Sequence, residues 1–159
     1  MANTEFTGEY RCALDAKNRI NIPSGIRKIF MPEANHTIVF TRGFESINVD
    51  AYPLNEWQRF TKELRKLNPL EKKTRNFNRL FVGSAFQVNM DSQGRVMIPE
   101  RIINLAKIQN EVLIIGVINK LEIWNPKIYE QYLQDENLNL ADVAEDLSSV
   151  REMFFEKGD

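Results

Sequence analysis

The sequence predicts an α+β fold in which one small module occurs twice and further helices follow. The chain has 159 residues, of which 43% are hydrophobic and 27% charged, a balance typical of a globular protein with a buried core. A ten-residue motif occurs twice, 76 positions apart, and each copy is flanked by the same pattern of strands and a short helix. Two modules of about 75 residues would each be marginal alone, so we expect them to pack closely together.

The motif runs from Leu14 to Pro23 and again from Met90 to Pro99. Each copy reads Asp-x-x-x-Arg followed by a hydrophobic residue, any residue, Ile and Pro. Upstream of each motif, apolar and polar residues alternate, which predicts a strand with one buried face. The positions on that face are Phe6, Gly8, Tyr10, Cys12 and Leu14 in the first copy, and Val82, Ser84, Phe86, Val88 and Met90 in the second.

A short helix is expected after each Pro, because a missing N–H costs nothing at the first helical position. Its buried stripe recurs at three- and four-residue spacing. The stripe residues are Ile26, Ile29 and Phe30 in the first copy, and Ile102, Leu105 and Ala106 in the second. Two apolar strands complete each module, at 36–41 and 47–51 in the first and at 111–117 and 121–124 in the second.

These elements divide the chain into four segments. The first module covers 5–53, a basic helical connector 54–79, the second module 80–126, and helices with an acidic tail 127–159. The connector is predicted to be helical from Leu54 to Leu67, with an interruption at Asn68-Pro69. The face of this helix carries Trp57, Phe60, Leu64 and Leu67. A last amphipathic segment starts at Pro126 and carries Tyr129, Tyr132 and Leu133, and the tail ends in an apolar patch of Val150, Met153 and Phe154.

Charge is distributed unevenly along the chain although its formal net value is only −1. Residues 59–79 contain eight basic and two acidic side chains, whereas the chain from 130 onward contains nine acidic and two basic ones. Both runs are compatible with solvated helix faces, and the basic run is also compatible with contact to a polyanion.

Several classes of site are excluded by residue counts. Cys12 is the only cysteine and His36 the only histidine, so an internal disulfide and a Cys- or His-rich metal site cannot form. We interpret His36 as a strand-edge residue and Cys12 as a buried thiol, and we expect no catalytic residue, metal or cofactor. The longest apolar run, 112–118, is far shorter than the roughly 20 residues of a membrane span, and the first residues do not form a secretory signal. We therefore expect a cytoplasmic protein with no membrane partner and no small-molecule substrate.

The chemistry of the repeated motif lies in its turn. Gly94 tolerates a positive φ and Asn18 is among the few other residues that do, so the chain can reverse sharply at both positions. The carboxylates of Asp15 and Asp91 can accept hydrogen bonds from backbone N–H groups two residues further on and thereby hold the turn. An arginine then emerges beside each rigid tip. The alternative is that each Asp and Arg pair only to close the turn.

The remaining polar residues favour contact with DNA. A two-stranded ribbon fits the major groove, where Arg19 or Arg95 could donate two hydrogen bonds to guanine. Lys17 is better suited to a phosphate, which positions the protein without specifying sequence. Gln93 occupies the equivalent place in the second copy and carries no charge.

Taken together, these motifs resemble the MraZ family of bacterial transcriptional regulators. The resemblance spans roughly residues 5 to 135 and includes two landmarks, Tyr52-Pro53-Leu54-Asn55-Glu56-Trp57 and Leu121-Glu122-Ile123-Trp124. It implies tandem AbrB-like swapped-hairpin modules that interlock within one chain, assembled into a homo-oligomeric ring, an octamer or similar. It also implies a repressor associated with the nucleoid that binds direct repeats in double-stranded promoter DNA upstream of its own division and cell-wall operon.

The resemblance also assigns roles to residues. DNA contacts fall on Lys17, Arg19, Gln93 and Arg95, and turn-forming roles on Asp15, Asn18, Asp91 and Gly94. The family commonly has Gly where this chain has Asn18, so the shape of the first turn is the point of departure.

Two other classes of function stay open. An antitoxin-like interaction module would use the swapped hairpins to dimerise and the acidic tail to wrap a basic partner. An enzyme would use Asp15 or Asp91 as a general base with the neighbouring Arg stabilising charge, but the sequence offers no paired nucleophile or metal cluster for it.

Overall fold

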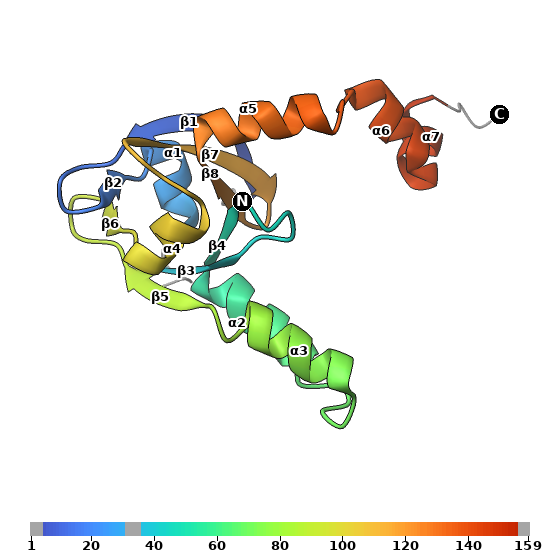
Figure 1. Ribbon diagram of the computed structural model, residues 1–159, viewed down its shortest axis with the longest axis horizontal. Helices are drawn as coiled ribbons and strands as arrows, with labels where there is room; N and C mark the ends of the chain where they lie inside the picture. Colours follow the sequence, from blue (N-terminus) through green and yellow to red (C-terminus); the bar gives the residue numbers. More distant parts are fainter. Residues whose placement is uncertain (1–4, 31–35, 156–159) are drawn as a thin grey trace. The chain divides into compact units, whose positions relative to one another are not determined.

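The computed structural model describes residues 5–30 and 36–155 and divides the chain into two compact units, Met1–Pro126 and Lys127–Asp159 (Figure 1). The strands are β1 (Phe6–Ala13), β2 (Arg19–Asn21), β3 (Thr37–Arg42), β4 (Val49–Pro53), β5 (Phe86–Asn89), β6 (Arg95–Met97), β7 (Glu111–Ile118) and β8 (Leu121–Trp124). The helices of the first unit are α1 (Ser24–Arg27), a 3₁₀ turn (Lys28–Phe30), α2 (Leu54–Leu64), α3 (Lys72–Phe81) and α4 (Glu100–Leu105). The second unit contains α5 (Pro126–Asp135, which begins at the boundary), α6 (Leu140–Asp146) and α7 (Ser148–Phe154).

The two modules interlock through their strands. Six strands form one sheet in the order β1-β7-β8-β4-β3-β5, and β2 pairs with β6 in a second, two-stranded sheet. The first strand of each module therefore pairs with the third strand of the other, β1 with β7 and β5 with β3, and every such pair is antiparallel. This exchange confirms the predicted α+β fold of two interlocked swapped-hairpin repeats with additional helices.

The two modules are related by a local two-fold axis that passes through the short β2–β6 ladder. Ile20 faces Val96, and these two residues are themselves equivalent in the repeat. Arg19 faces Met97 at one end of the ladder, and Arg95 faces Asn21 at the other. The turns that precede β2 and β6 consequently lie close together at one edge of the unit, as Figure 1 shows in blue and yellow-green.

A continuous apolar core fixes this arrangement. Ile20 and Val96 are buried under the ladder, and the predicted helix residues Ile26 and Ile102 are buried beside them. Full burial of one such side chain stabilises the fold by about 1.5–3 kcal/mol, so the paired motif strands are strongly anchored. In each motif, the apolar residues that follow the turn are buried in the core, and this burial fixes the position of the turn.

The helix pair α2 and α3 packs through a separate aromatic cluster. Tyr52, Trp57 and Phe81 are buried there, with the rings of Trp57 and Phe81 5.5 Å apart. Trp124 is buried as well, so both tryptophans are core residues. No described helix is long and apolar enough to cross a lipid bilayer.

One predicted strand is wrong at its start. Val82 and Ser84 do not belong to the strand of the second module, because α3 continues to Phe81 and β5 begins only at Phe86. The pair Phe77 and Phe81, four residues apart, packs ring against ring and favours helix over strand. Ser84 is buried just after α3 and not on a strand face, and its hydroxyl is satisfied by the carbonyl groups at the end of that helix.

Smaller differences concern element ends. The connector helix ends at Leu64, which leaves Leu67 exposed in the following turn, and the strand predicted from Ile47 begins at Val49. Pro23 and Pro99 each precede the first helical residue by one position. In the second unit, α5 begins at Pro126 as predicted.

Candidate nucleic-acid interface

The first motif turn, which we call loop 1 (Asp15–Arg19), is held by a single carboxylate. Asp15 Oδ1 accepts hydrogen bonds from the backbone N–H groups of Lys17 (2.8 Å) and Arg19 (2.9 Å). The N–H of Asn18 donates to the carbonyl of Asp15 at 3.0 Å, and the N–H of Asp15 donates to the carbonyl of Arg19 at 2.9 Å. These four hydrogen bonds are all made within five residues.

The second motif turn, loop 2 (Asp91–Arg95), repeats this geometry. Asp91 Oδ1 accepts from the backbone N–H groups of Gln93 (2.9 Å) and Arg95 (2.9 Å), and the N–H of Gly94 donates to the carbonyl of Asp91 at 3.0 Å. Two sequences that share only Asp and Arg thus form the same turn.

The fourth residue of each loop adopts a positive φ, 60° at Asn18 and 77° at Gly94. A turn closed by a residue in this conformation is typical of three-residue loops with a bulge. Asn18 adopts it although it is not glycine, so the departure from the family pattern leaves the shape of loop 1 unchanged.

Each loop is also tied to the opposite module. The carbonyl of Asn18 accepts from the N–H of Ile98 at 2.8 Å, and the carbonyl of Gly94 accepts from the N–H of Ile22 at 2.9 Å. Neither loop can shift without disturbing the other module's motif strand. This coupling makes the pair of loops one rigid feature.

The two arginines form the ion pairs that the alternative interpretation expected. Arg19 Nε lies 2.8 Å from Asp15 Oδ2, and Arg95 Nε lies 2.8 Å from Asp91 Oδ2. The side chains of Arg19 and Arg95 are 27% and 31% exposed, so the guanidinium groups lie along the loops and do not extend freely into solvent.

The ion pairs use only part of each guanidinium. Arg carries five N–H donors, and the contact with Asp occupies the single donor on Nε. Within residues 5–30 and 36–155, the terminal nitrogens of Arg19 and Arg95 make no hydrogen bond. Each pair therefore orients the side chain and leaves two NH₂ groups for an external acceptor.

Both carboxylates are ionised at neutral pH. The backbone N–H of Arg19 lowers the pKa of Asp15 below its usual value, with further contributions from the guanidinium of Arg19 and the N–H of Lys17. The equivalent donors of loop 2 lower the pKa of Asp91: first the backbone N–H of Arg95, then its guanidinium and the N–H of Gln93. A carboxylate of lowered pKa is a weak base at pH 7, which argues against the general-base role considered for these residues.

Lys17 and Gln93 occupy equivalent positions at the exposed tips of the two loops. Neither side chain has a hydrogen bond or ion pair with the described part of the chain. The tip of loop 1 therefore presents a free ammonium group, whereas the tip of loop 2 presents a neutral amide.

Sequence reasoning missed a cation beside loop 2. Arg27 donates from Nε (3.2 Å) and Nη2 (3.0 Å) to the carbonyl of Ile22, which places its guanidinium against Gly94. A Cβ at position 94 would lie 2.4 Å from Arg27 Cζ, so a side chain there would force the guanidinium to move. The equivalent residue of the second module is Ile103, and this difference in charge between matched positions of the repeat was the available signal.

The basic connector is largely engaged in its own contacts. Arg59 pairs with Glu56 at 2.6 Å, and Lys66 with Glu63 at 3.0 Å. Arg75 Nη1 donates to the carbonyls of Pro69 (3.1 Å) and Leu70 (2.8 Å) and so holds the turn between α2 and α3. Several basic side chains of residues 59–79 therefore form ion pairs or hydrogen bonds within the hairpin itself.

Other sequence candidates lie apart from the loops. Cys12 is half-buried, its thiol lies 3.5 Å from the carbonyl of Asn21, and burial raises its pKa. His36 lies in the turn just before β3. The described residues contain no group of three or more His, Cys, Asp or Glu side chains placed to hold a metal ion.

Comparisons with known proteins place the chain in a family. The model of the family described as "MraZ protein, putative antitoxin-like" matches residues 6–80 and 81–150. The chain is 34% identical over 140 residues to a protein of Christiangramia forsetii named "Transcriptional regulator MraZ", covering 88% of this chain and 90% of that one. It is 37% identical over 145 residues to a protein of Lactobacillus gasseri with the same name, covering 91% of this chain and 98% of the relative.

A solved structure is similar at a much lower level. The solution structure of PHS018 from Pyrococcus horikoshii aligns with 77% of this chain and 97% of its own, at 13% identity and a TM-score of 0.34. The family match covers both modules and each of their motifs. The chain belongs to the MraZ family.

Proposed function

We propose that this protein is a sequence-specific DNA-binding transcriptional regulator that reads DNA through loop 1 and loop 2. The observation that carries the proposal is the matched geometry of Arg19 and Arg95, each fixed through Nε while its terminal nitrogens have no partner among the described residues. The names of the relatives from Christiangramia forsetii and Lactobacillus gasseri support regulation of transcription.

The fixed arginines suit the edge of a guanine base. Guanine presents two acceptors, O6 and N7, in the major groove, and one bidentate contact is worth about 1–3 kcal/mol of discrimination against other bases. Holding the guanidinium in place before binding reduces the rotamer entropy that is lost on contact. The internal ion pair therefore assists recognition, since it fixes the direction in which the remaining donors point.

Neighbouring groups supply contacts to the DNA backbone. Lys17 at the tip of loop 1 is placed to bind phosphate, and Gln93 at the tip of loop 2 can donate a neutral hydrogen bond. Arg27 adds a cation beside loop 2, where the tip itself has none. Each loop thus combines one base-reading arginine with at least one phosphate-directed group.

Repetition of this unit explains how a small contact can bind tightly. The exposed part of two five-residue loops is too small for high affinity alone, and identical loops at a fixed spacing raise the effective concentration of each successive contact. We infer that copies of the chain assemble into a closed ring, an octamer or similar, that binds direct repeats. The proposed target is promoter DNA upstream of the protein's own division and cell-wall operon, where binding represses transcription.

Mobility shift and fluorescence anisotropy on the protein's own upstream DNA test this proposal. Arg19→Ala and Arg95→Ala should each weaken specific binding by about 5- to 150-fold, the equivalent of one lost bidentate contact. Arg19→Lys should weaken it too, because an ammonium group cannot make the planar two-point contact.

The matched control is Arg11→Ala. Arg11 is also an arginine in an ion pair, with Glu111 at 3.1 Å, but it lies in β1 outside both loops. This variant should bind DNA as the wild type does. Wild-type affinity for both loop variants, with unfolding and particle mass unchanged, would remove the loops from the mechanism.

A further inference from the structure

The α2–α3 hairpin (Leu54–Phe81) carries an apolar surface that the rest of the first unit does not cover. A groove of about 640 Å³ lies along the hairpin, lined by Leu64 and Val82 together with Arg65 and Arg79. A second hollow of about 220 Å³ lies over Phe77 and includes Phe44 and Leu80. Phe44 is 65% exposed and Leu80 is 61% exposed, which is unusual for large apolar side chains that lie side by side.

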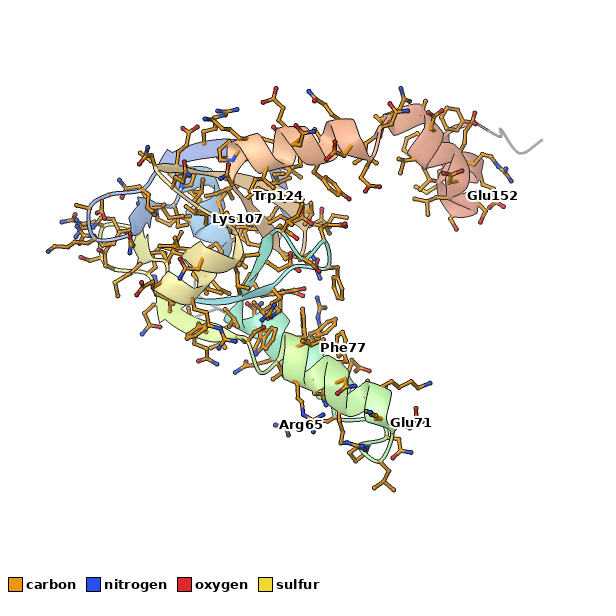
Figure 2. All side chains as sticks on the ribbon, in the orientation of Figure 1. Arg65, Glu71, Phe77, Lys107, Trp124 and Glu152 are labelled. Carbon is orange, nitrogen blue, oxygen red and sulfur yellow. The ribbon has the colours of Figure 1, made fainter. Side chains whose placement is uncertain are left out.

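The charge around this surface favours an acidic partner. Between Leu54 and Phe81 the hairpin carries eight basic and three acidic side chains. Two of these basic side chains, Arg65 and Arg79, line the groove. A further arginine from outside the hairpin, Arg42 at the end of β3, lines the second hollow. Figure 2 labels Arg65 and Phe77 on this hairpin. An occupant that combines apolar anchors with carboxylates would complement both features.

The C-terminal helices α6 and α7 have this composition. Large apolar side chains project from both helices, among them Leu140, which is 88% exposed, and Phe154, which is 73% exposed. From Leu140 to Phe154 there are four acidic residues and one basic residue, and Figure 2 labels one of the acidic residues, Glu152, on α7.

These two helices also need a partner for their own stability. Each has only seven residues, and helices shorter than about 12 residues are marginal in water without tertiary packing. The side chain of Asn139 caps α6, but no described residue of α6 or α7 is buried. Their apolar face is therefore suited to packing on a surface outside their own unit.

We propose that the α6–α7 segment of one copy docks on the α2–α3 surface of a neighbouring copy. Apolar residues such as Phe154 would pack against Leu80 and Phe44, and the carboxylates of the segment would face Arg42, which lines the same hollow. The two surfaces are different and complementary, so the contact is head-to-tail, and head-to-tail contacts close into rings when the rotation between copies permits. This inference rests on the ring assembly in the proposed function and names the surface that forms it.

Sedimentation velocity of the full-length protein tests the contact with three variants. Leu80→Glu places a charge in the docking surface and Phe154→Glu places one on the docking segment, and both positions are exposed, so folding should be preserved. Each should weaken association by about tenfold or more, as expected for loss of an anchor at the centre of an interface. Leu70→Glu is the control, because Leu70 is an exposed apolar residue of the same hairpin that lines neither the groove nor the second hollow.

Mixing the variants distinguishes docking between copies from docking within one. Leu80→Glu retains an intact segment and Phe154→Glu retains an intact surface, so the mixture should form a species of twice the monomer mass. Failure of the mixture to associate, when each variant alone is monomeric, would overturn docking between copies. Wild-type association should also weaken as salt rises, because exposed charges at the rim are screened.

The oligomeric mass of the wild type and of the variants distinguishes failure of the docking contact from failure of DNA binding by the loops. A monomeric wild type would overturn both the docking contact and the ring, and would favour a different acidic protein as the occupant of the surface. An assembled wild type whose mass is unchanged by Leu80→Glu and Phe154→Glu would overturn the docking contact alone. In both cases the loops are tested independently, since Arg19→Ala should leave the particle mass unchanged.

Discussion

Loop 1 and loop 2 have the same backbone and different surroundings. In both, one carboxylate accepts two backbone N–H groups and pairs with the Nε of an arginine at 2.8 Å. Loop 1 carries its additional cation at the tip, as Lys17, whereas loop 2 has a neutral tip and a cation at its flank, as Arg27. The residues that set the turn are shared between the two copies, and the residues that add charge have diverged.

Gly94 is the reason why the residues around loop 2 cannot simply be exchanged with those around loop 1. Gly94 leaves the space that the guanidinium of Arg27 occupies, and any Cβ there would overlap it. Asn18 in loop 1 has a Cβ, and the residue matching Arg27 is the apolar Ile103. A glycine at this position of the turn therefore serves two purposes in loop 2, conformation and space, and only the first applies in loop 1.

The largest expected difference between the loops is in stability. Gly94→Ala forces a residue with a side chain into φ near 77° and displaces Arg27, which should cost about 2 kcal/mol or more. Asn18→Ala meets only the conformational penalty, about 1 kcal/mol, and Asn18→Gly should be close to neutral. Urea unfolding of the three variants measures the differences, and equal costs for Gly94→Ala and Asn18→Ala would show that Arg27 does not occupy the space.

The next difference concerns the flank of loop 2. Arg27→Ile gives the first module the residue that the second module has, and it should weaken DNA binding by about tenfold while lowering the salt slope by about one. The reason is the loss of one phosphate contact without any change in the arginine that reads the base. Anisotropy titrations at several salt concentrations test this, with Lys28→Ala, an exposed neighbour in the following 3₁₀ turn, as the control. An unchanged slope would limit Arg27 to a structural role.

A smaller effect is expected at the tips. Lys17→Gln should reduce the salt slope by about 0.9 and weaken binding evenly across DNA sequences, because a phosphate contact carries no sequence information. Gln93→Lys should change the slope by a similar amount in the opposite direction. The double variant, which exchanges the two tips, should restore the wild-type slope. A change in sequence preference in any of the three would show that the tips contact bases instead.

The repeat made most of the architecture predictable from sequence. Its offset aligned two strand–turn–strand–helix patterns, and the structure places the buried stripe residues Ile26 and Ile102 where the spacing predicted. The interlock itself followed only from the family resemblance, because pairing between β1 and β7 is a long-range property that no local pattern contains. The predicted start of the first strand of the second module was wrong, because alternation at Val82 and Ser84 competed with helical spacing at Phe77 and Phe81, and tertiary packing decided in favour of the helix.

The residues that form the two turns were predictable from sequence, whereas the orientation of the arginines beside them was not. The four residues that form the turns could be inferred from the tolerance of Gly and Asn for positive φ and from the ability of Asp to bond the backbone. The sequence could not decide whether Arg19 pairs with Asp15 or contacts DNA, and the structure shows that one guanidinium has donors for both. Arg27 was missed because its proximity to Gly94 depends on the crossing of the two modules, which joins residues 67 positions apart.

The smallest effect is expected in acid, and here the two loops should agree. The donors around Asp15 and Asp91 lower both pKa values in the folded state, whereas in the unfolded chain each carboxyl titrates near its ordinary value of about 3.9. Stability from these groups is therefore fully present above the unfolded pKa and is lost as pH falls through the lowered folded pKa. Both side chains are accessible to solvent, which screens the interactions and keeps the effect small.

Carboxyl NMR titration of the folded protein should show both groups ionising below the ordinary range, and Asp15→Asn or Asp91→Asn should each flatten the acid limb of the stability curve. A folded pKa at or above the ordinary value in one loop alone would break the equivalence of the turns. The carboxylate would then hold only one of the two arginines, and the loop that keeps its depressed pKa would be the one oriented for base reading.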